Sequence, residues 1–449
     1  MTTLQPDERL SSARLGAYAT LAIPVSMLMM QLIVYLPPFY AQTVGIDLAT
    51  VGGIFLLARA WDAFIDPAVG YMSDHTRSRW GRRKPWLAVG IPLLMVGTWA
   101  FLQPPEGVGV TYLLVTSFLF YIALTMVQIP YLSLGAELSR QYDERTRITS
   151  MREAGTMVGN LVATSVPLLV LAATNPSLQE ILGVFAVMVL IGLPIAGVCL
   201  LAFTPSGSHQ SRSSFRQALK VIPINKPLQR LLIGVFLFWL GGSIFNALVL
   251  FVIEYGLGLP SSGFLWLVFT QYITGILGLP VWMWVARTWS RHVALTLGGL
   301  AFLGALPLLF LFEGAGLIQC AMLFAGLGLV SSVIWVMPPA LVADTIEYGV
   351  MRGLGDDAAL YMALYNFVQK MAIAIGVGLA LPLVAMAGFT PGTENTPTAI
   401  NSMMMIALCL PVLIALPGGY LLGTYKLDAR RHGLVRLYIK RRQQKEISP

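Results

Sequence analysis

The chain has 449 residues, of which 56% are hydrophobic and only 11% are charged. Soluble domains carry about 25% charged residues, so this composition excludes a soluble globular protein. Long apolar runs recur along the whole chain and predict an all-α integral membrane protein. The net charge of +8 reports membrane orientation rather than nucleic-acid binding, because no folded basic face is available.

Twelve membrane-spanning helices are predicted along the chain. The longest polar connection leaves six of them on either side, and both halves place a basic loop after their second span, a faint internal symmetry typical of transporters. We expect an N-terminal six-helix bundle at 1–204, a linker at 205–230, a C-terminal six-helix bundle at 231–425 and a basic tail at 426–449. The predicted spans are 17–42, 50–74, 86–104, 109–138, 153–174, 181–204, 231–256, 263–286, 293–312, 317–344, 358–388 and 400–425.

The positions of the cationic residues predict the orientation of these spans. Every Lys and Arg except Arg59 and Lys370 lies on one side of them, whereas the other side carries only acids such as Asp47 and Glu106. Basic segments stay in the cytoplasm, so both termini are predicted to be cytoplasmic, in an inner (cytoplasmic) membrane. Residues 1–14 show no cleavable signal, and the first span is expected to act as an uncleaved anchor.

The second span carries three charges on one helical face. Arg59, Asp62 and Asp66 are spaced i, i+3 and i+7. Asp62 lies 12 residues before Asp74, which places it roughly 18 Å inside the membrane. A carboxylate at that depth costs at least ~2.5 kcal/mol and persists only beside a cavity, a partner or an ion. Because two acids one turn apart repel each other, a shared proton or small cation is favourable, which predicts a coupling-ion site. A structural ion pair with Arg59 or Lys370 is the alternative.

Later spans contain polar side chains with two possible roles each. Lys370 lies in mid-span and fits either a structural salt bridge between bundles or one that breaks during transport. Arg152 fits a positive-inside anchor or a site residue. Trp335 and Tyr365 either pack within the bundle or stack on a substrate, and the amide of Asn366 bonds between helices or lines a cavity.

Several function classes are excluded or disfavoured. No Lys is followed by Ser or Thr, so the phosphate loop of an ATP-driven pump is absent. The three Cys are isolated and the four His form no ligand cluster, so neither a disulfide framework nor a metal site is expected. No nucleophile–base pair lies outside the membrane, so we expect no enzymatic activity.

Four dispersed motifs resemble one transporter family. Residues 61–67 (WDAFIDP), 77–86 (RSRWGRRKPW), 143–147 (DERTR) and 344–349 (DTIEYG) are similar to motifs of the glycoside–pentoside–hexuronide:cation symporters, the melibiose-permease-like branch of the major facilitator superfamily. The resemblance spans nearly the whole chain. It implies two pseudo-symmetric six-helix bundles, a central substrate cavity and alternating access driven by a cation gradient.

The resemblance implies a cation site. Asp62 and Asp66 match the two cation-binding carboxylates of the family, and Thr125 matches a threonine that lends an oxygen. Gln128 stands where the family has an acid, and its carbonyl can serve as a ligand. Sodium and proton coupling both stay open, and no other metal or cofactor is expected.

The match to the family's sugar site is partial. Arg152 and Trp335 resemble its Arg and its stacking Trp, and Lys370 matches a membrane-embedded Lys. Ser26 stands where an aspartate is expected. The loss of this acid beside several cations hints at an anionic substrate such as a hexuronide. Tyr365 and Asn366, in the same span as Lys370, complete the candidate set.

The loop after the second span resembles the gating loop of the superfamily. Its spacing of Gly70, Asp74 and Gly81 matches, and the basic residues are implied to clasp neighbouring helix ends when the transporter faces outward. The predicted gating residues are Arg59, Gly70, Asp74, Gly81, Arg82 and Arg83.

These observations predict a secondary transporter that couples import of a small polar solute, such as a sugar, glycoside, uronide or related acid, to a proton or sodium ion. Its expected partners are the solute, the cation and the lipid bilayer, and we expect a monomer. Transport or export of an amphiphilic, drug-like compound is the alternative. A non-transporting membrane sensor is a third hypothesis, which the short basic tail does not favour.

Overall fold

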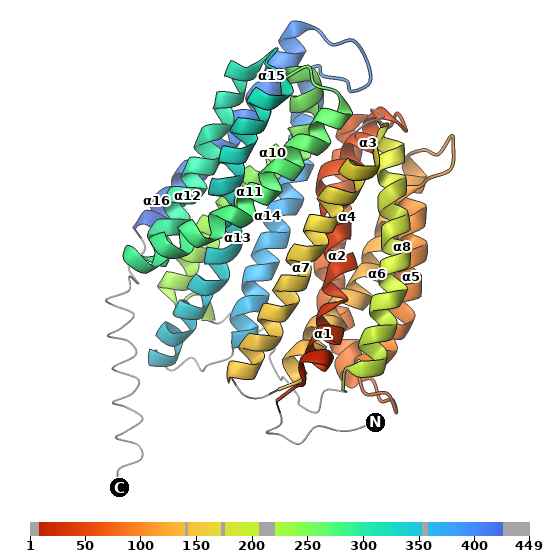
Figure 1. Cartoon of the computed structure of the whole chain (residues 1–449), viewed down its shortest axis with the longest axis vertical. Helices are drawn as coiled ribbons and strands as arrows, with labels where there is room; N and C mark the ends of the chain where they lie inside the picture. Colours follow the sequence, from red (N-terminus) through yellow and green to blue (C-terminus); the bar gives the residue numbers. More distant parts are fainter. Residues whose placement is uncertain (1–8, 140–141, 172–175, 206–220, 353–357, 425–449) are drawn as a thin grey trace.

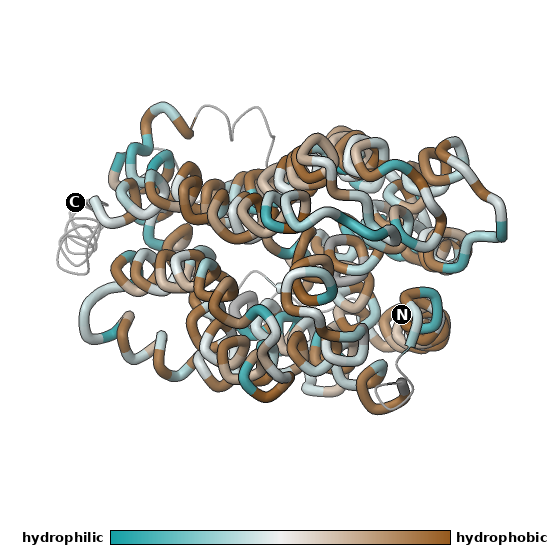
Figure 2. Tube along the Cα trace, turned by 90° about the horizontal axis from the view of Figure 1, so that it is seen from above, coloured by the Kyte–Doolittle hydropathy of each residue, from teal (hydrophilic) through white to brown (hydrophobic). Residues whose placement is uncertain are grey.

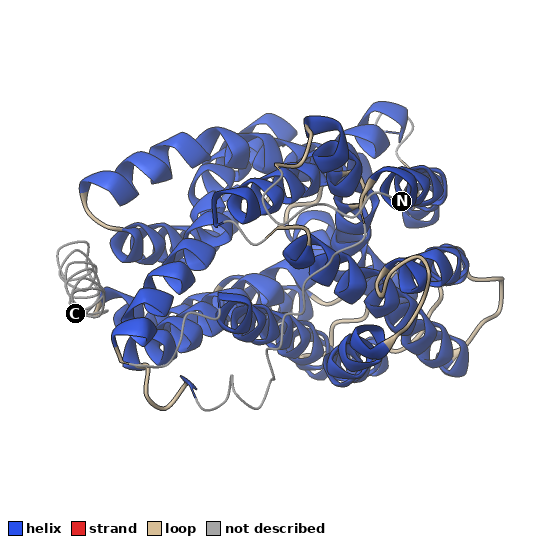
Figure 3. Ribbon diagram, turned by 90° about the horizontal axis from the view of Figure 1, so that it is seen from below, coloured by secondary structure: helices blue, strands red, loops and turns tan. Residues whose placement is uncertain are grey.

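The computed structural model describes residues 9–139, 142–171, 176–205, 221–352 and 358–424. Every regular element in these ranges is a helix (Figure 3), which confirms the all-α prediction. The N-terminal and C-terminal bundles stand side by side (Figure 1). The first contains α1 (Ser12–Ala19), α2 (Ala22–Met30), η1 (Gln31–Tyr35), α3 (Leu36–Gln42), α4 (Leu48–His75), α5 (Lys84–Leu102), α6 (Val110–Glu137), α7 (Tyr142–Leu171) and α8 (Leu178–Phe203). The second contains α10 (Lys226–Phe251), η2 (Val252–Gly256), α11 (Ser261–Thr288), α12 (Arg291–Ala305), η3 (Leu306–Phe312), α13 (Leu317–Met351), α14 (Ala358–Met386), α15 (Pro397–Leu408) and α16 (Leu410–Gly423).

Eleven helices in the described ranges are long and apolar enough to span a membrane. The first predicted span, 17–42, is not among these eleven. It lies in four consecutive pieces, α1, α2, the π-helix η1 and α3. These pieces follow one another along the height of the molecule (Figure 1), so the fold is consistent with the predicted twelve spans. Apolar residues dominate the helices, and hydrophilic residues gather in the connecting loops (Figure 2).

The two ends of the molecule differ in charge. We call the end where α4 finishes and α5 begins the basic end, and the end with the turn before α4 the acidic end. At the acidic end, Asp47 caps α4 by accepting a hydrogen bond from the Thr50 backbone N–H at 2.9 Å. The predicted linker at 205–230 and tail at 426–449 lie mostly outside the described residues, and their bounds stay predictions.

The bundles contact each other closely at the acidic end. The α4 helix packs against α14, and a methyl group added at Gly52 would lie 2.8 Å from Cδ of Pro382. One at Gly378 would lie 2.6 Å from Cβ of Leu56. Gln42 of α3 donates a hydrogen bond to Glu254 of η2 at 3.1 Å. The acidic end is therefore closed.

At the basic end, the ion pairs found among the described residues stay within one bundle. Arg83 pairs with Glu137 in the first bundle, and Arg291 pairs with Asp344 in the second. In α7, the side chain of Glu153 is 51% exposed. The close inter-bundle contacts of Gly52, Gly378 and Gln42 thus lie at the acidic end, whereas these ion pairs at the basic end do not cross between the bundles.

Candidate functional site

The predicted cation-binding residues meet a lysine from the other bundle. Thr125 of α6 donates a hydrogen bond to Oδ1 of Asp62 at 2.7 Å and lies 3.2 Å from Oδ1 of Asp66. The Lys370 ammonium of α14 lies 3.1 Å from Oδ2 of Asp62 and 2.6 Å from Oδ2 of Asp66. At the junction of the two bundles, the Oδ2 atoms of both acids therefore contact the ammonium, and their Oδ1 atoms face the Thr125 hydroxyl.

Burial makes this cluster sensitive to charge. Asp62 is only 2% exposed, whereas the side chains of Asp66 and Lys370 retain 20% and 23%. Removing one partner from such a buried pair is costly, because the remaining charge loses both its solvation and its counter-charge. The Lys370 ammonium is therefore bound to these acids unless another cation replaces it.

Arg59 completes the charge balance of the cluster. It is buried one turn before Asp62, with its guanidinium 5.3 Å from the ring centroid of Tyr121. Its Nη2 is buried without a hydrogen-bond partner. The two carboxylates, the ammonium and the guanidinium sum to zero. A further monovalent cation would leave the cluster positive unless Lys370 left it.

Gln128 lies three residues after Thr125 on α6 and so shares its helical face. No hydrogen bond of its side chain is found among the described residues. Its predicted contribution to the cation site stays a prediction.

Arg152 meets an acid that the sequence analysis did not single out. Its Nε and Nη2 both donate to Oε1 of Glu153, the former at 3.2 Å. Tyr18 and Tyr131 lie close by, and their hydroxyls bond each other's backbone carbonyls across the α1–α6 contact. Arg152 and Glu153 thus offer a cation and an anion to a polar solute, whereas both tyrosines are buried.

The remaining predicted substrate residues differ in accessibility. Trp335 is 58% exposed and packs edge-on against Trp239, with ring centroids 4.6 Å apart. Asn366 is exposed, whereas Tyr365 is buried. Ser26 is also buried, because α2 packs against Gly159 of α7 there, and its hydroxyl donates to the Ile23 carbonyl at 2.9 Å. The structure thus leaves Trp335 and Asn366 accessible, and Tyr365 and Ser26 covered.

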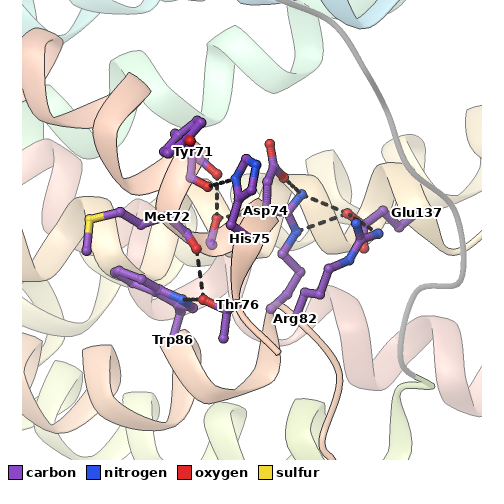
Figure 4. A network of polar contacts seen from close by, with 11 residues as sticks. Tyr71, Met72, Asp74, His75, Thr76, Arg82, Trp86 and Glu137 are labelled. Carbon is purple, nitrogen blue, oxygen red and sulfur yellow. Dashed lines mark hydrogen bonds and ion pairs between the residues drawn. The ribbon is translucent and has the colours of Figure 1, made fainter. Parts of the chain in front are cut away.

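The predicted gating loop forms a clasp that ties α4, α5 and α6 together. Arg83 donates to Oγ of Ser73 at 2.6 Å, to Oε1 of Glu137 at 2.7 Å and to Asp74. Arg82 adds an ion pair to Glu137 at 3.6 Å. Figure 4 shows Asp74, Arg82 and Glu137 turned toward one another.

The glycines and Arg59 of the predicted gating set behave differently. Gly81 has φ +88°, a backbone conformation that favours glycine in the turn before α5. A side chain at Gly70 would meet only an ordinary contact at 3.7 Å, so space does not require glycine there. Arg59 lies 15 residues before Asp74 on α4, about 22 Å away, and belongs to the cation cluster rather than the clasp.

Glu137 and Glu153 are the main polar residues that sequence reasoning missed. Each stands beside or opposite an arginine that the analysis had named. An acid near the end of an apolar span is a usable signal for Glu137, because such a charge needs a partner. The adjacency of Glu153 to Arg152 was a comparable signal.

The chain is similar to known transport proteins. The model of the family described as MFS/sugar transport protein matches residues 17–429. A glucuronide carrier protein homologue of Escherichia coli is 26% identical, with 88% of each chain covered. An isoprimeverose transporter of Lactiplantibacillus pentosus is 24% identical over 88% of this chain and 84% of its own.

The fold also resembles a solved transporter structure. A bacterial homologue of the human lysosomal transporter Spinster, in an inward-facing and unoccupied conformation, aligns with a TM-score of 0.66. The alignment covers 96% of this chain and 98% of that chain at 11% identity. At this identity the similarity concerns the fold alone.

Proposed function

Because the chain belongs to the MFS/sugar transport protein family, we propose that it is a cation-coupled symporter of a small sugar-like solute. The solute class comprises sugars, glycosides, uronides and related acids. It is consistent with the names of the relatives, a glucuronide carrier homologue and an isoprimeverose transporter. The resemblance to a cation-coupled branch of the major facilitator superfamily agrees with this membership.

The observation that carries the proposal is the cluster of Asp62, Asp66, Thr125 and Lys370. It lies where α4 and α6 of one bundle meet α14 of the other. A bound cation at this point changes the contact that joins the bundles. Binding of an ion is therefore linked to their relative movement, which is what coupled transport requires.

The cluster suggests how coupling operates. A cation, H+ or Na+, and the Lys370 ammonium compete for the oxygens of Asp62 and Asp66, because both together would leave the buried cluster with excess positive charge. Cation entry releases Lys370 from the two acids, and the freed ammonium then joins Arg152 in binding the solute. When the cation leaves, Lys370 returns to the acids and neutralises the empty carrier.

We further infer the placement of the protein in the membrane. The basic end faces the cytoplasm of an inner membrane, as the positive charges predict, and both termini lie on that side. In this orientation, closure at the acidic end corresponds to an inward-facing state. The transporter is expected to work as a monomer.

The test is transport by the purified protein in proteoliposomes, with a panel of neutral sugars, glycosides and uronates under an imposed Na+ or H+ gradient. We expect one gradient to drive accumulation of a member of this panel, and Asp62→Asn to abolish that accumulation. Asp47→Asn is the matched control, because it makes the same change in the same helix at an N-cap, where Asn serves as well as Asp. Accumulation that survived Asp62→Asn would overturn the proposed coupling.

A further inference from the structure

The two bundles carry related clasps at the basic end, but the clasps are not equally complete. In the first bundle, Arg83 at the start of α5 bonds Asp74 near the end of α4 and Glu137 at the end of α6. Acids from two helices therefore hold one arginine. Three helix ends are fixed by this contact.

In the second bundle, the corresponding arginine holds one of the neighbouring helices. Arg291 at the start of α12 donates to Oδ1 of Asp344 in α13 at 2.6 Å. Near its end, α11 carries Arg287, whereas α4 carries Asp74. Residues 280–312 contain no Asp or Glu. No ion pair of Arg287 is found among the described residues, and its side chain is exposed. The end of α11 is thus left out of the clasp, next to a like charge.

A cavity occupies the place where α11 would be tied in. It has a volume of about 410 Å³ and lies between the ends of α11, α12 and α13. Arg287, Ser290, Arg291 and His292 line its polar side, together with the Asp344 carboxylate that already pairs with Arg291. The N-terminus of α12 opens towards it, and the partial positive charge of a helix N-terminus adds to the arginines. Asp344 offsets one of the two arginines, and the positive charge that remains favours an anion that contacts both of them.

The walls of the cavity and its surroundings indicate where that anion comes from. The remaining wall is largely apolar and includes Met283, Val336 and Leu341. Trp284 and Trp289, at the same end of α11, are 65% and 66% exposed. Exposed tryptophans of this kind mark the membrane–water interface. A ligand with a phosphate at the interface and an acyl chain against the helices fits both parts of the lining.

We propose that this cavity binds the phosphate of an anionic phospholipid, which bridges Arg287 and Arg291 and completes the second clasp. Basic pockets between transmembrane helices on the cytoplasmic side are suited to such headgroups. The lipid supplies the negative charge that Asp74 supplies in the first bundle. It thereby ties the end of α11 to α12 and α13.

The experiment measures lipid binding to the full-length protein in neutral detergent by native mass spectrometry and by thermal unfolding. Phosphatidylglycerol is the probe, phosphatidylcholine is the zwitterionic comparison, and inorganic phosphate is the free-anion arm. We expect phosphatidylglycerol to bind and to raise the unfolding temperature, and the other two to have little effect at the same concentration. Arg287→Gln should weaken phosphatidylglycerol binding about fivefold.

Arg79→Gln is the matched control, because Arg79 is an exposed basic-end arginine of the other bundle. Equal losses in Arg79→Gln and Arg287→Gln would show nonspecific attraction and overturn the proposal. So would equal binding of phosphatidylcholine, or an equal stabilisation by inorganic phosphate, which would identify the ligand as a free anion. Unfolding in phosphatidylcholine alone reports whether the Arg287→Gln variant is folded, and no outcome depends on transport.

Discussion

At the scale of single residues, Lys370 is the group on which the coupling scheme depends. Its ammonium contacts both Asp62 and Asp66 and so links α14 of one bundle to α4 of the other. A lysine in this position can act as an internal counter-ion, because it is present in every state and needs no binding step. When the empty carrier changes between its two open states, the carboxylates of Asp62 and Asp66 therefore stay paired.

Replacing Lys370 with Met should therefore separate two kinds of transport. Net uptake requires return of the empty carrier and should fall at least ~tenfold, because each unpaired buried carboxylate costs at least ~2.5 kcal/mol. Exchange of internal for external solute, in which the carrier stays loaded, should persist. The cation concentration for half-maximal exchange should fall, because the competing ammonium is gone. Radiolabelled uptake and counterflow in the same proteoliposomes measure both.

Lys226→Met is the control for this experiment. It makes the same change at an exposed lysine at the start of α10. An equal fall of net uptake and exchange in Lys370→Met would contradict the counter-ion role. It would indicate instead that Lys370 is required to bind the solute in every mode.

The sequence predicted part of this cluster for a physical reason. The spacing of Asp62 and Asp66 on one helical face is a property of a single helix, so it can be read without a structure. The contacts of Lys370 with these acids join residues more than 300 positions apart. They depend on how two bundles pack, which helical periodicity does not determine. Arg152 and Glu153 are adjacent in the sequence, which was a signal for their pairing, although the contact itself depends on rotamers.

At the scale of elements, the Arg83 clasp is a test of how buried charge stabilises helix ends. Arg83 and Glu137 are 5% and 3% exposed, whereas the side chain of Asp74 is 43% exposed. Breaking the buried pair leaves an uncompensated charge, but the exposed acid is screened by solvent. The two acids should therefore contribute very differently.

Glu137→Leu should lower the free energy of unfolding by about 3 kcal/mol, and Asp74→Asn should lower it by at most about 1 kcal/mol. Thermal or denaturant unfolding of the purified variants in the same detergent measures the difference. Equal losses would show that the burial of Arg83 does not control the strength of the clasp.

Sequence reasoning located the elements but not their internal breaks. The apolar run at 17–42 reads as one span, because hydropathy reports composition rather than backbone hydrogen bonding. The structure divides it into α2, the π-helix η1 and α3, after a first piece that begins at Ser12. A π-helical turn also ends the seventh span, at Val252–Gly256. Hydropathy gives no sign of either turn.

At the scale of the whole molecule, composition and charge were sufficient to predict a helical membrane protein. The conformational state was not accessible in this way, because the same residues must fit every state of the transport cycle. In this structure the state is set by contacts such as that of Gly52 with Pro382, where a missing side chain lets α4 approach α14. Small residues at such contacts allow helices to pack closely within a membrane.

The closed acidic end should therefore be opened by adding bulk at Gly52. A Cβ added at this position would lie 2.8 Å from Cδ of Pro382, so Gly52→Leu cannot be accommodated without separating the bundles there. Spin labels on cysteines introduced at Val110 and Thr393, one in each bundle at the acidic end, should report a longer distance in this variant. Solute uptake should be lost, because the transporter can no longer close at that end.

Gly53→Leu is the matched control, because a side chain at Gly53 meets nothing within 4 Å. It makes the same chemical change in the adjacent residue of the same helix and should leave both the label distance and uptake close to those of the unsubstituted protein. If Gly52→Leu kept the shorter distance, closure would not depend on the α4–α14 contact. Closure would then be attributed to the hydrogen bond between Gln42 and Glu254, which joins the bundles at the same end.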